Sequence, residues 1–113
     1  KMIDEEPDLV RRFVQASMEG WTSYLQNPAP GNALIQEANP EMTDEQIAYG
    51  IEKMKAYGLV TGGDAAAGGI GVMTDARWEK IHDFMLTAGL VDEDLDIHDV
   101  YSLDYLPKEP VLP

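Results

Sequence analysis

The sequence contains no cysteine, and this absence removes several kinds of site at once. With no Cys among its 113 residues, the chain can form no disulfide, no thiolate zinc site and no cysteine nucleophile. Positive charge is also scarce, because 8 Lys and Arg stand against 21 Asp and Glu, for a net charge of -13. Phosphate backbones and anionic membrane surfaces attract Lys and Arg, so we expect no nucleic-acid partner.

Long hydrophobic runs are missing as well. No apolar stretch approaches the ~18 residues that a membrane span needs, and the first residues lack the basic-then-apolar pattern of a signal peptide. Both ends of the sequence nevertheless look cut. The last eight residues, LPKEPVLP, include three prolines, which disfavour helix. We therefore predict one helical segment over residues 1–113, with an extended tail at 108–113.

Helix start and stop signals divide the rest of the chain. Pro7 suits the first position of a helix, and Thr43 with Gln46 forms a capping box at another start. Thr74 can cap a further helix, and Gly89 can end it. These signals predict a mainly α fold with four principal helices, near residues 7–26, 30–38, 44–57 and 75–88.

Two aromatic residues, Trp21 and Tyr24, fall on the apolar face of the first long helix. They could form an aromatic platform for a ligand, but large aromatics more often fill a core. We predict that Trp21 and Trp78 are structural anchors.

The predicted helices together carry more apolar faces than four helices of this length can cover. Those faces are led by Phe13, Trp21, Ile51, Met54, Trp78 and Ile81.

Three patterns resemble chemical motifs and fail on spacing. In the glycine-rich stretch, a dinucleotide-binding GxGxxG would need Gly where Thr74 stands, and no GK[ST] follows. We therefore predict a flexible surface loop over residues 62–68.

His82 and Asp83 could suggest a metal or acid–base site, but they are adjacent in a helix and so cannot face the same way. The acidic run from Asp92 lacks the Gly and Glu of a calcium loop, which leaves a short solvated turn with an N-cap. Residues 98–103 alternate polar and apolar and could be extended. No catalytic residue, metal ligand or cofactor is predicted.

Four segments together resemble the C-terminal part of the NMT1/THI5-like family. They are PDLVRRFVQASMEGWTSYLQNP, ANPEMTDEQIAYGIEKMKAYGLV, GIGVMTDARWEKIHDFMLTAGL and DVYSLDYLP. They cover nearly the whole chain, and the specificity lies in their order and spacing. Members of this family include substrate-binding proteins of bacterial ABC importers, with a two-lobe α/β periplasmic-binding-protein fold of type II.

The resemblance implies a fold and a role, and it leaves the ligand contacts unassigned. It implies that this chain is the last third or so of a two-lobe protein, with a signal peptide upstream and a periplasmic or extracytoplasmic location. The expected role is the substrate-binding component of an importer, and the expected partners are a membrane permease and a small solute such as a thiamine-precursor pyrimidine. No ligand-binding residue can be transferred, because no ligand motif of the family matches here.

Two other kinds of protein stay open. One is an autonomous helical interaction module, and the other is an enzyme that makes the thiamine pyrimidine. The Cys-rich motif of the family's enzymes is absent from this Cys-free chain, so no enzyme activity is carried over. The uncovered apolar faces predict that the fragment pairs as a homodimer.

Overall fold

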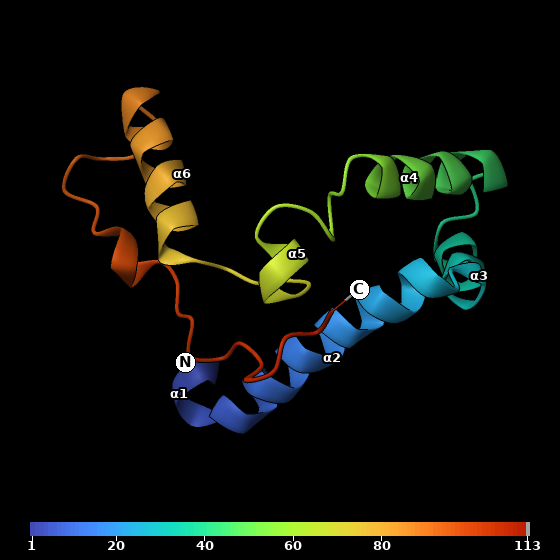
Figure 1. Ribbon diagram of the computed structural model, residues 1–113, viewed down its shortest axis with the longest axis horizontal. Coiled ribbons are helices and arrows are strands. Elements are labelled where there is room, and N and C mark those ends of the chain that lie inside the picture. The colour runs from blue at the N-terminus through green and yellow to red at the C-terminus, as the bar shows by residue number, and fades with distance from the viewer. Residues whose placement is uncertain (113) are drawn as a thin grey trace.

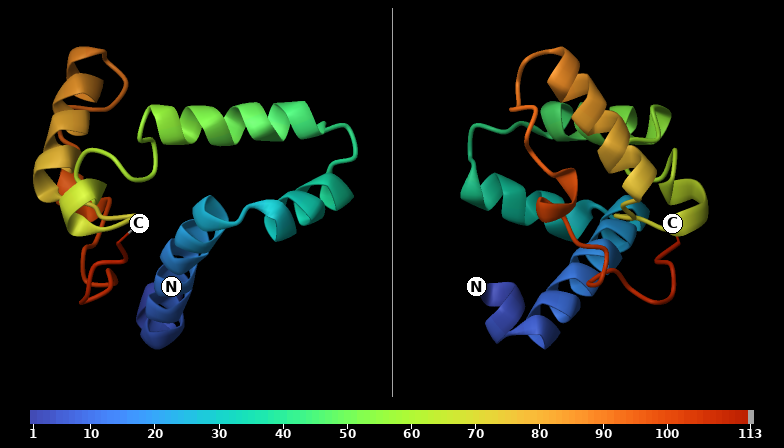
Figure 2. Two further views of the ribbon diagram at one scale, coloured as in Figure 1. Left: turned by 45° about the vertical axis from the view of Figure 1, so that its right-hand side comes forward. Right: turned by 90° about the vertical axis from the view of Figure 1, so that its left-hand side faces the viewer.

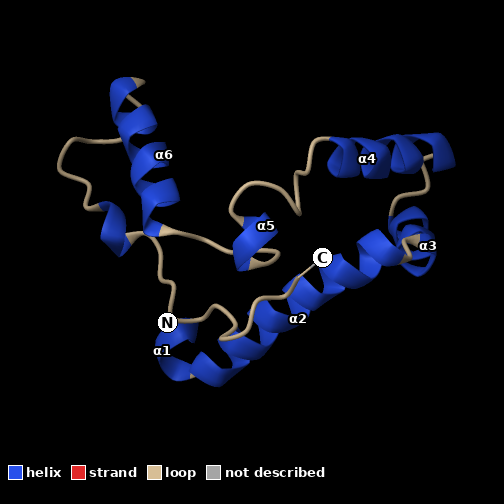
Figure 3. Ribbon diagram, viewed as in Figure 1, coloured by secondary structure: helices blue, strands red, loops and turns tan. Residues whose placement is uncertain are grey.

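The computed structural model describes residues 1–112 and contains helices joined by irregular segments, with no strand among those residues (Figures 1 and 3). The helices are α1 (Met2–Glu5), α2 (Pro7–Gln26), α3 (Ala29–Ala38), α4 (Asp44–Ala56), α5 (Ala65–Gly68), α6 (Asp75–Thr87) and the short 3-10 helix η1 (Ile97–Asp99). The prediction of a mainly helical chain is confirmed, and the four principal helices lie within one or two residues of their predicted bounds.

Side-chain caps explain why α4 and α6 begin where they do. At α4 the Thr43 N–H donates to Gln46 Oε1 over 2.9 Å, and the Gln46 N–H donates back to Thr43 Oγ1 over 3.3 Å. At α6 the Arg77 N–H donates to Thr74 Oγ1 over 3.3 Å. Each cap satisfies backbone donors that the first helical turn leaves without a partner.

The molecule is far more open than a domain of its size. Its radius of gyration is 17.0 Å and its principal extents are 46 × 35 × 29 Å, whereas a compact chain of this length has a radius of about 13 Å. Its accessible surface is 8466 Å², against about 6200 Å² for a folded monomer of this mass. The helices therefore leave about 2300 Å² more surface exposed than such a monomer does.

A small core joins the middle of α2 to the centre of the chain. The buried apolar side chains in the described part are Met18, Ile47, Ala65 and Ile70. Ile70 is only 2 % exposed, and its N–H donates to the Val111 carbonyl over 2.8 Å. The C-terminal segment thus runs back beside α2 and α5, as both views in Figure 2 show.

The structure confirms that the helices cannot cover all their apolar faces, and it corrects one of the predicted anchors. Phe13 is 71 % exposed and Ile81 is 42 % exposed, whereas Ile51 and Met54 are half-buried. Trp21 is 43 % exposed, so the prediction that it anchors the core is wrong for this chain. The half of α2 that carries it faces an opening between helices instead of another element.

Two local predictions were also wrong. Residues 62–68 were expected to be a flexible loop, but their second half forms α5, because the run of alanines at 65–67 favours helix. Residues 98 and 99 were expected to be extended, but they lie in η1, because Asp96 accepts the His98 N–H over 2.9 Å and starts a turn. That cap agrees with the predicted turn in the acidic run.

The segment predicted as an extended tail contains no helix or strand over residues 108–112, and Pro113 lies outside the described residues. None of the helices described here is long and apolar enough to cross a membrane.

Candidate ligand-binding site

Trp21 is an exposed aromatic side chain in contact with a second aromatic ring. Its ring meets that of Tyr24 edge to face, with centroids 6.1 Å apart and planes at 87°. Tyr24 is fixed in turn, because its hydroxyl donates to Asn32 Oδ1 over 2.8 Å. Its ring also lies so close to Gly31 that an added Cβ would be 2.8 Å away. The Trp21 indole therefore presents a defined surface to solvent.

Two hollows meet at Trp21. The first, which we name the α2–α4 hollow, has a volume of about 520 Å³. Its lining residues are Ser17, Gly20, Trp21, Tyr24, Ile35 and Met54. No lining side chain is charged, and the Ser17 hydroxyl is already occupied, because it donates to the Phe13 carbonyl over 2.8 Å.

The second hollow is also lined by Trp21 and combines apolar walls with charge. We name it the Trp21–Arg77 hollow, and its volume is about 490 Å³. Its lining residues are Trp21, Leu59, Val60, Gly62, Asp64, Ala65, Ile70, Gly71, Val72 and Arg77. Apolar walls with a few polar groups that converge on them are typical of small-molecule sites.

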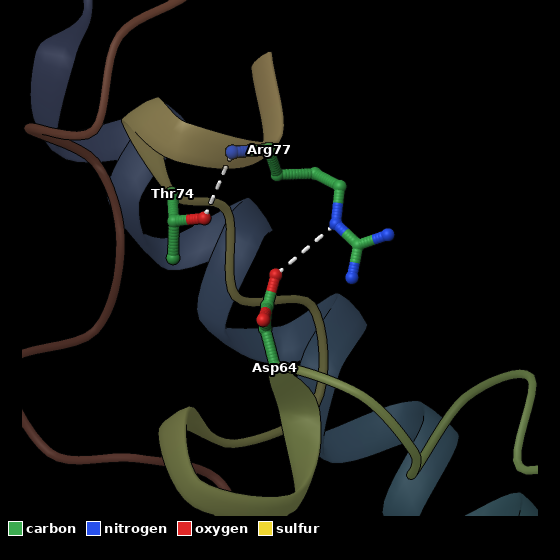
Figure 4. Close-up of polar contacts among 3 residues, drawn as sticks. All are labelled: Asp64, Thr74 and Arg77. Atoms are coloured by element: carbon green, nitrogen blue, oxygen red, sulfur yellow. Dashed lines mark hydrogen bonds and ion pairs between the residues drawn. The ribbon is translucent and has the colours of Figure 1, made fainter. Parts of the chain in front are cut away.

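Arg77 is the hydrogen-bond donor of this hollow. Its Nε donates to Asp64 Oδ2 over 3.2 Å, and the Thr74 cap fixes its backbone (Figure 4). Both side chains of the pair are partly exposed, so the ion pair orients the guanidinium more than it stabilises the fold. The terminal nitrogens Nη1 and Nη2 have no hydrogen-bond partner within residues 1–112, and Nη2 lies 3.5 Å from where a Cβ on Gly63 would be.

A tight turn places Asp64 opposite Arg77. The Gly62 N–H donates to the Gly58 carbonyl over 2.8 Å, and a Cβ on Gly62 would lie 2.7 Å from that oxygen. Only glycine fits at such an approach between two backbones. The turn therefore forms part of the wall of the Trp21–Arg77 hollow and also positions the Asp64 carboxylate.

The other polar residues considered from the sequence do not join this site. His82 is half-buried, and its Nε2 has no hydrogen-bond partner among the described residues. His98 lies 3.3 Å from the Tyr101 hydroxyl, in a cluster built on the first turn of α6. Within residues 1–112 no group of three or more His, Asp or Glu side chains is placed to hold a metal ion.

The Trp21–Arg77 hollow can stack a planar ring and donate hydrogen bonds to its edge. Sequence reasoning weighed Trp21 as a platform but missed Asp64 and Arg77. The two residues are 13 positions apart in the sequence, and no motif marks the pair. The one available signal was that the chain has few cations, and Arg77 is one of them.

Comparison with known proteins gives one informative relative. No family model and no solved structure matches the chain. The chain is 25 % identical over 107 residues to the riboflavin-binding protein RibY of Chloroflexus aurantiacus. That match covers 94 % of this chain and 30 % of RibY, so the chain spans less than a third of the length of this relative.

Proposed function

We propose that this chain is the C-terminal part of the substrate-binding component of an ABC importer of the NMT1/THI5-like kind. In this proposal the complete protein has two lobes, works outside the cytoplasm and delivers a small organic solute to a membrane permease. It is a binding protein and carries out no reaction. The solute belongs to the planar heteroaromatic compounds, which include flavins and the thiamine-precursor pyrimidines.

The observation that carries the proposal is the match to RibY along 94 % of the chain. A similarity that runs from end to end supports a shared architecture better than a short motif would. RibY is named for binding riboflavin, a planar ring system whose edge carries carbonyl oxygens and ring nitrogens. The match supports a solute of that chemistry for this protein.

The geometry of the Trp21–Arg77 hollow agrees with such a solute. The Trp21 indole offers a face for stacking, which favours aromatic rings. The unpaired Nη groups of Arg77 can donate to acceptors on a ring edge, since a guanidinium donates in a planar fork. The net charge of -13 repels anions at long range, so an uncharged ring with acceptors suits the site better than a phosphorylated one.

Calorimetric titration of the intact gene product tests the proposal. The titrants are riboflavin, the hydroxymethyl pyrimidine precursor of thiamine, and ribose as a solute that lacks an aromatic ring. We expect saturable binding of one of the two aromatic compounds and none of ribose. Absence of binding for both aromatic compounds would refute the heteroaromatic assignment, and catalytic turnover of either would favour the enzyme alternative.

A further inference from the structure

Asp64 gives the Trp21–Arg77 hollow a hydrogen-bond acceptor in addition to the donors of Arg77. Its Oδ2 accepts the Arg77 Nε–H over 3.2 Å. Its Oδ1 accepts no hydrogen bond within residues 1–112, and the side chain makes no cap bond to α5. Since a carboxylate acts only as an acceptor, Oδ1 is available to an N–H group of a ligand.

The free donors of Arg77 lie beside this acceptor. Nη2 lies 3.5 Å from where a Cβ on Gly63 would be, and Gly63 directly precedes Asp64 in the chain. Figure 4 shows the pair joined through one atom of each side chain. Within the described residues, the other carboxylate oxygen and both terminal nitrogens remain without a partner. The hollow therefore presents a donor next to an acceptor.

Local backbone structure holds both side chains in place before a ligand arrives. The Thr74 cap fixes the first turn of α6, which carries Arg77, and the turn at Gly62 positions Asp64. The side chains of Arg77 and Asp64 are 54 % and 43 % exposed, so a ligand can reach both. Groups that are already oriented cost less to order on binding.

A donor next to an acceptor is complemented by a ring edge that offers an acceptor next to a donor. An edge made only of acceptors would satisfy Arg77 but would set its lone pairs against Asp64 Oδ1. A polar group left without its partner makes a site reject such a ligand. Two kinds of ring carry the matching edge. In a flavin, a ring N–H stands between two carbonyls, and in an aminopyrimidine, an amino group stands beside a ring nitrogen.

We infer that Asp64 and Arg77 together select solutes whose ring edge carries an N–H donor next to an acceptor. An Nη group of Arg77 donates to the acceptor, and Asp64 Oδ1 accepts the N–H while the ring stacks on Trp21. This inference rests on the proposed function and narrows its solute from planar heteroaromatic compounds in general to those with this edge. It gives Asp64 a contact with the ligand besides its part in orienting Arg77.

Methylation of the edge donor tests the inference in the wild-type protein. Calorimetric titration of the intact gene product compares riboflavin with N3-methylriboflavin, which keeps the ring and its carbonyls but has lost the N–H. The hydroxymethyl pyrimidine is compared in the same way with its dimethylamino derivative, so the two kinds of ring are distinguished. We expect methylation to weaken binding of whichever ring binds by about tenfold or more, because hydrogen bonds to a charged group are strong.

Asp64→Ala separates a direct contact from an effect of the added methyl group elsewhere. This variant has no acceptor to lose and has room for the methyl group, so the methylated and unmethylated rings should bind it with similar affinity. Asp83→Ala is the control, since it removes one negative charge from an exposed position of α6 that lines neither hollow. The control should keep the full effect of methylation.

Two results would overturn the inference and leave the proposed function standing. The first is equal affinity of the methylated and unmethylated rings for the wild-type protein, a comparison that needs no variant. The second is an effect of methylation as large in Asp64→Ala as in the wild type, which would limit Asp64 to orienting Arg77. Absence of binding for both unmethylated rings would refute the proposed function and the inference with it.

Discussion

The Tyr101 hydroxyl donates a hydrogen bond of 2.6 Å to Asp75 Oδ1, which joins the segment after η1 to the first turn of α6. The Tyr101 ring lies flat against Trp78, with centroids 4.9 Å apart and planes at 3°. The hydrogen bond joins residues 26 positions apart in the sequence. The two contacts fix the segment that leads from α6 back toward α2, and so they help to position the C-terminal segment.

The same hydrogen bond predicts an unusual titration for Tyr101. The bond to Asp75 comes first among the causes that raise the pKa of Tyr101 to about 12, followed by desolvation and the negative charges of Asp75, Glu79 and Asp96. A raised folded-state pKa favours the protonated phenol. The stability that this shift contributes to the folded state is therefore fully present below the unfolded-state pKa of 10.0, and it is lost as the pH rises through about 12.

Absorbance of the phenolate as a function of pH measures this effect. We expect one of the 5 tyrosines to ionise near pH 12, and Tyr101→Phe to remove that step alone. Asp75→Asn keeps a hydrogen-bond acceptor but removes the charge, so it should move the step toward lower pH. A single ionisation of all tyrosines near pH 10 would contradict the prediction.

Trp78 and Trp21 are expected to differ in their effect on stability. Trp78 is half-buried and stacked on Tyr101, so Trp78→Ala in the 113-residue chain should cost about 2 kcal/mol. Trp21 is 43 % exposed, so Trp21→Ala should cost less than about 1 kcal/mol in the same chain at concentrations where it is monomeric. Chemical denaturation of both variants measures the two losses, and equal losses would contradict the placement of Trp21 at an open surface.

Gly69 controls whether the C-terminal segment can reach α5. Its φ is +89°, and an added Cβ would lie 2.8 Å from the Val111 nitrogen and 3.1 Å from the Pro110 Cα. Gly69→Ala therefore meets both backbone strain and a clash with backbone atoms, and should cost about 2 kcal/mol. Gly89→Ala is the matched control, since Gly89 has a similar positive φ of +66° but nothing lies within 4 Å of its Cβ, so this variant carries the backbone strain without the clash. Thermal unfolding that ranks the two variants in the opposite order would refute this role.

Local signals predicted the helices because the side chains that start them act within one turn. The Thr43 and Thr74 caps need only residues three positions away, so they can be read from the sequence. The surroundings of Trp21 depend on how α2 and α4 are arranged in space. Helical periodicity shows which face of a helix is apolar, but it does not show which element that face contacts. The pair of Asp64 and Arg77 was missed for the same reason, because a turn that ends at Gly62 brings the two together.

Arg77 should affect solute binding without affecting the fold. In the intact gene product, Arg77→Met removes the donors of the Trp21–Arg77 hollow and should weaken riboflavin binding about tenfold or more, because hydrogen bonds from a charged donor are strong. Arg12→Met is the control, since Arg12 is an exposed arginine on α2 that lines neither hollow. Equal affinities in the two variants would exclude Arg77 from the site and leave the proposed function standing. Tighter binding of riboflavin phosphate than of riboflavin would favour an anion as its partner.

The 113-residue chain on its own should associate with itself. Its exposed apolar side chains include Phe13 at 71 %, Leu34 at 66 % and Tyr57 at 73 %, and a soluble monomer rarely exposes apolar patches of more than a few hundred Å². The α2–α4 hollow is one place where two chains can bury such surface, and a symmetric dimer is the simplest closed arrangement. The net charge of -13 per chain opposes pairing, so added salt should strengthen it by screening that repulsion.

Light scattering over a concentration series, at low and at high salt, measures the molar mass. Trp21→Glu should shift the chain toward monomer, whereas Phe84→Glu, at an apolar side chain on α6 that is more exposed than Trp21, should shift it less. A monomer at all concentrations that binds no dye for apolar surface would contradict the prediction, because these helices would then have found a way to cover their own faces.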